Sequence, residues 1–144
     1  MELSKAIRTA YYTALNGNVT YNGNDVPLFD AYAVPNGVSY PYILLSSQTS
    51  NQLRIKRCKR YNASILIDIV TGSTDPIGRS DAEDISEQID NIISPDTFKD
   101  LDLSAYDYQI IDTYRDNDTD LSDKNNVYYI FRKLLTYNHL VVEN

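Results

Sequence analysis

The chain has one cysteine, one histidine and no tryptophan among its 144 residues. Because Cys58 is alone, it cannot form an internal disulfide, which agrees with a reducing compartment. No apolar run approaches the roughly 18 residues that a membrane helix needs. Residues 1–15 are too polar for a secretory signal. We therefore expect a protein that lacks a membrane span and is made and kept in a cytoplasm.

The familiar motifs of catalytic and cofactor sites are also missing. The sequence has no phosphate-binding loop, dinucleotide fingerprint, zinc-ligand spacing or serine nucleophile elbow. We therefore predict no catalytic residue, no cofactor and no metal ligand, and the protein is not expected to be an enzyme.

The bulk composition is that of a folded domain. Apolar residues make up 42% of the chain and charged residues 23%, both within the usual globular range. A chain of this length buries about two-thirds of the surface that its unfolded form exposes. We expect a single domain that covers residues 1–144.

Charge is distributed unevenly along the sequence. The net charge of −7 argues against general affinity for nucleic acid, because phosphate contacts need clustered cations. Fifteen acidic residues lie between Asp75 and Asp123, against only three basic ones. Five of the thirteen basic residues fall within seven positions, here called the basic tract: Arg54, Lys56, Arg57, Lys59 and Arg60. Such a tract protects an exposed strand edge, forms a partner surface or contacts DNA directly.

Helical periodicity appears twice. Apolar residues recur at helical spacing over residues 3–15, and Asn16-Gly17 supplies a left-handed residue that ends the helix. A second amphipathic helix is predicted over residues 80–93, where Ser80 and Glu83 have the spacing of a capping box. Its buried stripe is expected to contain Ala82, Ile85, Ile89, Ile92 and Ile93.

Alternating apolar residues predict strands between and after these helices. The clearest is residues 61–70, whose apolar face indicates a strand covered by helices on one side. Residues 46–51 are polar and typical of a turn. Weaker signals predict a loose hairpin around Asn22-Gly23, an extended arm over residues 26–34, and strands over residues 42–45, 106–114 and 127–140, the last two joined by an acidic loop over residues 115–126.

These elements define an α+β fold class. We expect an antiparallel sheet packed against the N-terminal helix and the central amphipathic helix, as a two-layer sandwich.

Two chemical alternatives need to be weighed against an inert scaffold. Asp116, Asp118 and Asp120 match the start of a calcium loop that extends to Asp123, although the glycine and the closing glutamate of such loops are replaced. A solvated hairpin loop is the simpler interpretation.

The second alternative is a cysteine enzyme. Neighbouring cations favour the thiolate of Cys58, and His139 is the single residue able to serve as its imidazole base. No orienting third residue is evident, so an inert cysteine in a sheet is the simpler interpretation.

The order of these features resembles that of the tail-terminator (tail-completion) proteins of tailed bacteriophages, also called neck or head–tail joining proteins. The resemblance covers about two-thirds of the chain. It rests on the helix over residues 3–15, the phrase Tyr40-Pro41-Tyr42-Ile43, the polar segment 48–60, the alternating strand 61–70 and the helix 80–93.

The resemblance implies a structural virion protein without catalytic residues. Such subunits form a closed ring, usually a hexamer, which caps the tail tube and joins it to the head connector. The implied partners are other copies of the chain, the tail tube protein and the head-completion or portal-side connector. DNA would pass through the lumen without specific binding, and the protein would reside in the tail or neck of the virion after assembly in the host cytoplasm.

Unlike charges provide candidate surfaces for such an assembly, since each interface in a ring joins two different patches. We expect the basic tract to form one patch and the acidic helix face at Asp81, Asp84 and Glu87 to form another. Two other functions stay open: a neck ring between portal and tail, and a small binding module that depends on calcium.

Overall fold

The computed structural model describes residues 2–30, 39–55, 58–73, 78–93, 101–124 and 129–143. The fold is α+β, with two helices and a five-stranded mixed sheet beside a small two-stranded one. The elements in chain order are α1 (Leu3–Leu15), β1 (Thr20–Tyr21), β2 (Asn24–Asp25), β3 (Leu28–Phe29), β4 (Tyr42–Ile55), β5 (Cys58–Ser73), α2 (Gly78–Ile93), the 3-10 helix η1 (Ser104–Tyr106), β6 (Tyr108–Lys124) and β7 (Tyr129–Glu143).

Helix α1 has the predicted bounds and ends as its sequence indicates. The Asn16 backbone N–H donates to the Tyr12 carbonyl, and Gly17 then adopts a φ of 77°, which favours glycine. The side-chain amide of Asn18 donates to the Ala14 carbonyl over 2.8 Å, so a last-turn carbonyl is satisfied. The chain then enters the β1–β2 hairpin, where Asn22 and Gly23 both have positive φ, as the turn signal predicted.

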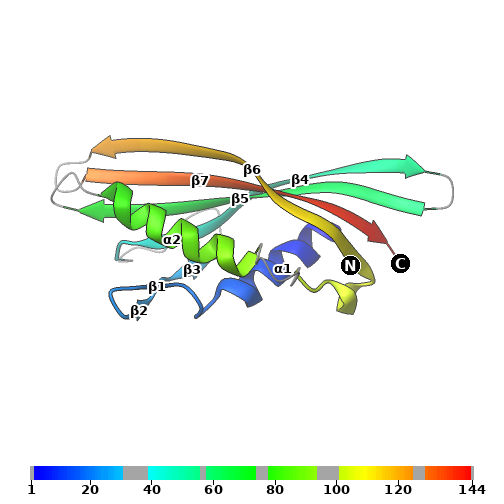
Figure 1. The fold of residues 1–144 in the computed structure, drawn as a ribbon, viewed down its shortest axis with the longest axis horizontal. Helices are drawn as coiled ribbons and strands as arrows, with labels where there is room; N and C mark the ends of the chain where they lie inside the picture. The colour runs from blue at the N-terminus through cyan, green and yellow to red at the C-terminus, as the bar shows by residue number, and fades with distance from the viewer. Residues whose placement is uncertain are drawn as a thin grey trace.

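The large sheet has the strand order β3-β4-β5-β7-β6. Its four long strands are antiparallel to their neighbours, whereas the two-residue β3 pairs with β4 in parallel. Strand β5 lies at the centre, between β4 and β7. The hairpins β4–β5 and β6–β7 point to opposite ends of the molecule (Figure 1).

Both helices cover the same face of this sheet (Figure 1). Alternation along β5 directs Ala63, Ile65, Ile67 and Ile69 into the core, all at most 2% exposed, as the sequence predicted. The predicted stripe of α2 is also confirmed: Ala82, Ile85, Ile89 and Ile93 are buried, and Ile92 is partly buried. The fold is therefore the expected two-layer sandwich.

Three local predictions are wrong. Residues 46–51 belong to β4, with a register irregularity between Leu45 and Gln48, so they form strand rather than turn. Residues 115–124 continue β6, so most of the predicted acidic loop is also strand. Helix α2 begins at Gly78, which places Ser80 inside its first turn, where it cannot be the N-cap residue of a capping box.

The opposite face of the sheet has polar groups buried in its middle. Asp68 on β5 is 2% exposed and forms an ion pair with Arg132 on β7. Nearby, the ring of Tyr40 stacks on that of Tyr42, with 5.7 Å between centroids. The Tyr40 ring lies so close to Gly72 that a Cβ on that glycine would be 2.5 Å from Cδ2 of Tyr40. This face therefore needs glycine at position 72.

Candidate assembly surface

The described residues of the basic tract lie near the end of the β4–β5 hairpin. Ile55 pairs with Cys58, so the two strands are joined through residues 56 and 57. The last pair between β5 and β7 is Arg60 with Val142, and the hairpin extends beyond the end of β7 (Figure 1). Lys59 and Arg60 are exposed there. Lys56, Arg57 and the side chain of Arg54 lie outside the described part of the structure.

The predicted acidic patch on α2 is only partly available. Asp84 and Glu87 are exposed, whereas Asp81 is half-buried. The Tyr21 hydroxyl of β1 donates to Oδ2 of Asp81 over 2.9 Å, which attaches the β1–β2 hairpin to the helix. The structure does not bring this patch to the basic tract within one chain, because α2 lies toward the other end of the sheet (Figure 1).

The sequence did not predict a charged cluster between α2 and the β6–β7 hairpin. Arg115 on β6 donates to the Ser86 hydroxyl over 3.0 Å and to the Tyr137 hydroxyl over 3.3 Å. It also lies 3.4 Å from the carboxylate of Asp90. Burial raises the pKa of Tyr137 to about 12, so its hydroxyl stays protonated and donates to Asp90 over 3.0 Å. These contacts hold α2 to the outermost strand.

The acidic run of β6 continues this cluster. Nζ of Lys133 lies 2.8 Å from the carboxylate of Asp118 and 3.2 Å from that of Asp120. Burial lowers the pKa of Lys133, but the two carboxylates outweigh burial and the pKa is raised above its ordinary value. Arg79 at the start of α2 also approaches Asp120, at 3.4 Å. Three cations therefore compensate two of the aspartates, since Arg115 also lies 3.7 Å from Asp118.

This arrangement argues against a calcium-binding loop at Asp116, Asp118 and Asp120. A calcium loop curls its ligands around one point, whereas Asp116, Asp118 and Asp120 lie along an extended strand. Among the described residues, no three acidic, histidine or cysteine side chains gather as a metal site would require.

His139 is placed where it cannot serve Cys58. It pairs with Ala63 across β5 and β7, five residues from Cys58, which is about 17 Å along a strand. His139 is 1% exposed and contacts the Tyr11 hydroxyl and the Ala63 carbonyl instead. The alternative of a cysteine–histidine pair is therefore contradicted, and the imidazole has a structural role.

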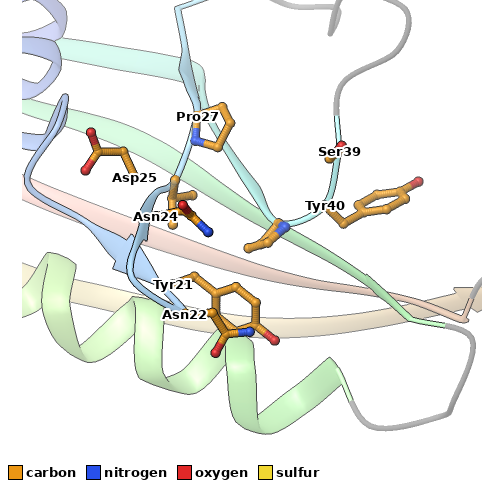
Figure 2. A pocket seen from close by; sticks show the side chains of 9 residues that line it. Tyr21, Asn22, Asn24, Asp25, Pro27, Ser39 and Tyr40 are labelled. Atoms are coloured by element: carbon orange, nitrogen blue, oxygen red, sulfur yellow. The ribbon is translucent and has the colours of Figure 1, made fainter.

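A surface cavity of about 330 Å³ lies beside the β1–β2 hairpin. Its lining comes from that hairpin, from the segment before β3 and from the segment before β4 (Figure 2). Asp25 is the one carboxylate among the described lining residues, which include no histidine, cysteine or lysine: Tyr21, Asn22, Asn24, Asp25, Val26, Pro27, Ser39, Tyr40 and Pro41. These residues supply no pairing of nucleophile and base.

The three most exposed large apolar side chains of the described residues lie on the outermost strand, β6. Ile111, Tyr114 and Leu121 of β6 are 51%, 49% and 47% exposed, more than any other large apolar residue in the described part of the chain. Leu53 on β4, at the opposite edge of the sheet, is 37% exposed. Exposed apolar residues along an unpaired sheet edge make that edge a candidate for contact with another protein.

No described helix is long and apolar enough to cross a membrane.

Comparison with solved structures gives a likeness in fold. No family model matches the chain, and no curated protein matches its sequence. A similar solved structure is described as "Virion of native gene transfer agent (GTA) particle". One chain of that particle superposes with a TM-score of 0.73 at 14% sequence identity, and the match covers 97% of each chain. At this identity the likeness establishes a shared fold over nearly the whole length of both chains.

Proposed function

We propose that the chain is a structural protein of a tailed phage-like virion, namely a tail-terminator subunit. In this role, copies of it close a hexameric ring on the end of the tail tube and join the tube to the head connector. The observation that carries the proposal is the fold shared with a chain of a gene transfer agent virion over 97% of each chain. The sequence pattern independently resembles that of tail terminators.

The described site chemistry agrees with a structural role. The buried histidine, the buried lysine and the half-buried Arg115 all bind neighbouring side chains or backbone groups. Each of these contacts joins two elements of the fold, so the groups hold the sandwich together. We therefore propose a protein without enzymatic activity and without a cofactor.

Electrostatics supplies surfaces that suit a ring. Each interface of a cyclic ring joins two different patches of the subunit. The basic tract at the β4–β5 tip and the exposed acidic residues of α2 lie at separate places on the molecule, so one copy can present one patch to its neighbour. The acidic surplus of −7 also suits a lumen through which DNA slides without being held.

The proposed partners follow from this position. They are further copies of the chain, the tail tube protein and the head-completion or portal-side connector, within a virion assembled in the host cytoplasm. A neck ring between portal and tail is the alternative with the same fold. Binding to isolated tail tubes of the same virus favours the terminator, and binding to portal-bearing heads alone favours the neck ring.

The direct test is the assembly state of the purified chain. Native mass spectrometry over a range of concentrations, with negative-stain microscopy, is expected to show closed rings of one stoichiometry, either free or on tail tubes. A chain that stays monomeric at every concentration and binds neither tubes nor heads contradicts the proposal.

Charge reversal tests the role of the basic tract. Changing Arg54, Lys56 and Arg57 together to glutamate is expected to impair ring formation more than folding. The control is Lys5→Glu on α1, which changes an exposed cation away from the tract. If the triple variant still forms rings at physiological salt, the tract only protects a strand edge.

A further inference from the structure

We infer that neighbouring subunits pair through the edges of their sheets, with β6 of one copy beside β4 of the next. This inference rests on the proposed ring and identifies its contact surface, in which aspartates of β6, and not the acidic residues of α2, face the basic tract. The occupant of each edge is thus a second copy of this chain.

Both edges of the sheet are long and open in the described part of the chain. Strand β6 has 17 residues and pairs with β7 on one side, with no strand on the other. Strand β4 has 14 residues, but β3 pairs only with Ile43 and Leu44, so no strand covers the outer side from Leu45 to Ile55. Open edges of this length are templates for another strand.

Side chains on these edges favour a protein neighbour. The three most exposed large apolar residues (Ile111, Tyr114 and Leu121) all lie on β6, and Leu53 lies on β4. The apolar residues lie among the aspartates of β6, so this edge has both an apolar contact surface and a negative charge.

Charge distinguishes between the two ways in which edges can meet. Asp112 and Asp116 on β6 are exposed, whereas Lys59 and Arg60 are exposed beside the end of β4. Two copies that met through β6 alone would bring like charges together, which is unfavourable. A head-to-tail contact between β6 and β4 brings unlike charges together instead.

Strand direction supports the same contact. The strands β4, β5, β7 and β6 alternate in direction, so β4 and β6 run opposite to each other. Rotation about a ring axis leaves the direction of each strand along that axis unchanged. When β6 of one copy lies beside β4 of the next, the two strands are therefore antiparallel, and the alternation continues from subunit to subunit.

Two irregularities in β6 bear on the register of the contact. The pairing with β7 shifts between Ile110 and Asp112 and again between Arg115 and Asn117. Because bulges bend an edge, the regular run after the second shift and the short run between the shifts are separate contact segments. Ile111 lies at the first shift, next to the short run, and Leu121 lies in the regular run, so the two positions report on the two segments.

Cysteine cross-linking tests the contact directly. In a Cys58→Ser background, Ile111→Cys or Leu121→Cys is combined in turn with a cysteine on β4. A disulfide within one chain is excluded, because β4 and β6 are three strand spacings apart, about 14 Å, and the Cα atoms of a disulfide lie within about 7 Å. The positions to scan on β4 are Thr49→Cys, Asn51→Cys and Leu53→Cys, which are exposed and lie on the same face of the sheet as Leu121.

The expected result is a ladder of covalent oligomers that ends at the ring size found by native mass spectrometry. Cysteine pairs in register are expected to cross-link at least ten-fold faster than the control pair Ile111→Cys with Glu83→Cys, which joins β6 to the exposed face of α2. If rings form but none of the six β4–β6 pairs yields a ladder, the edge contact is overturned and the ring proposal stands. If no oligomer forms under any condition, both fail.

A matched pair of substitutions gives a second readout. Tyr114→Lys places a cation on β6, and Tyr12→Lys makes the same change on α1, where Tyr12 is 38% exposed. We expect Tyr114→Lys to reduce the ring fraction at least ten-fold. Its melting temperature should fall no further than that of Tyr12→Lys. Equal ring fractions in the two variants contradict the edge contact.

Discussion

Tyr11 on α1 donates its hydroxyl proton to Nε2 of His139 on β7, with 2.5 Å between oxygen and nitrogen. The direction follows from two observations: Nδ1 lies 2.9 Å from the Ala63 carbonyl, which can only accept, and burial lowers the pKa of His139, which favours the neutral ring whose Nε2 accepts. The imidazole is therefore neutral, with its proton on Nδ1. Since Tyr11 is fully buried and His139 is 1% exposed, this chain of hydrogen bonds attaches α1 to the middle of the sheet.

The first prediction concerns this attachment. Tyr11→Phe removes the hydroxyl and leaves Nε2 of His139 buried without a donor, which should lower the free energy of unfolding by about 1–3 kcal/mol. Urea denaturation followed by circular dichroism measures the change. Tyr12→Phe is the matched control, because Tyr12 is 38% exposed, and it should change stability by less than about 0.5 kcal/mol.

The protonation of His139 supplies the second prediction. Burial lowers its pKa below the ordinary value of 6.5 in the folded chain, and the hydrogen bond to Ala63 only partly opposes this. As pH falls, the unfolded chain therefore binds a proton at His139 before the folded chain does. The contribution of His139 to the free energy of unfolding is complete above pH 6.5, and it decreases as pH falls from 6.5 to the folded pKa. His139 is the single histidine of the chain, so the histidine NMR signal should titrate with a midpoint below pH 6.5. A midpoint at or above that value contradicts the buried arrangement.

The third prediction tests the contact between Gly72 and Tyr40. A Cβ at position 72 would lie 2.5 Å from the Tyr40 ring, so Gly72→Ala should destabilise the fold by about 1–3 kcal/mol. Tyr40→Ala removes the obstructing ring, and the double variant should therefore lose less than the sum of the single losses. A double-mutant cycle from urea denaturation measures this coupling. Additive losses would show that the ring is not the obstacle.

Lys133 is the subject of the fourth prediction. Lys133→Met leaves the carboxylates of Asp118 and Asp120 facing each other without their shared cation. Because these carboxylates are 37% and 32% exposed, water screens part of the effect, and we expect a loss of about 1–3 kcal/mol. Thermal and urea unfolding measure the loss, with the exposed Lys5→Met as control. Equal stability of the two variants would mean that the Lys133 contacts contribute nothing.

The fifth prediction concerns added calcium. Asp118 and Asp120 already bind Lys133 along a strand, so calcium at about 5 mM, above the range of weak extracellular sites, should leave the melting temperature of the wild-type chain unchanged. Differential scanning fluorimetry with and without a chelator makes the comparison. A rise in melting temperature would restore the alternative of a calcium-dependent binding module.

The parts of the fold that bury apolar surface could be predicted from the sequence. Helix α1 was predicted with its observed bounds, and the core face of β5 was predicted residue by residue. In both, the period of apolar residues reports directly on which side faces the core. The helix over residues 80–93 was also found, but its start was placed too late because Ser80 and Glu83 imitate a cap.

Other parts could not be predicted, because their sequence lacks such a period. Residues 46–51 lie in β4 near the hairpin that extends beyond the core, and polar side chains are tolerated there on both faces. In β6, Asp116, Asp118 and Asp120 have low strand propensity, and strand pairing with β7 outweighs it. The Lys133 contacts and the Tyr11–His139 hydrogen bond join residues far apart in sequence, so spacing alone gave no signal for them.

Strands β5 and β7 pair in the middle of the large sheet. Among their paired residues, Ser73 and Tyr129 are the pair closest to each other in sequence. A nascent chain that has been synthesised only as far as α2 therefore has the buried isoleucines of that helix. It still lacks β7 and thus part of the sheet on which these isoleucines pack. Synthesis must reach β7 before the hydrophobic layer closes. A newly made subunit should thus depend on chaperones until β7 has been synthesised. Only then should it become competent to join other copies.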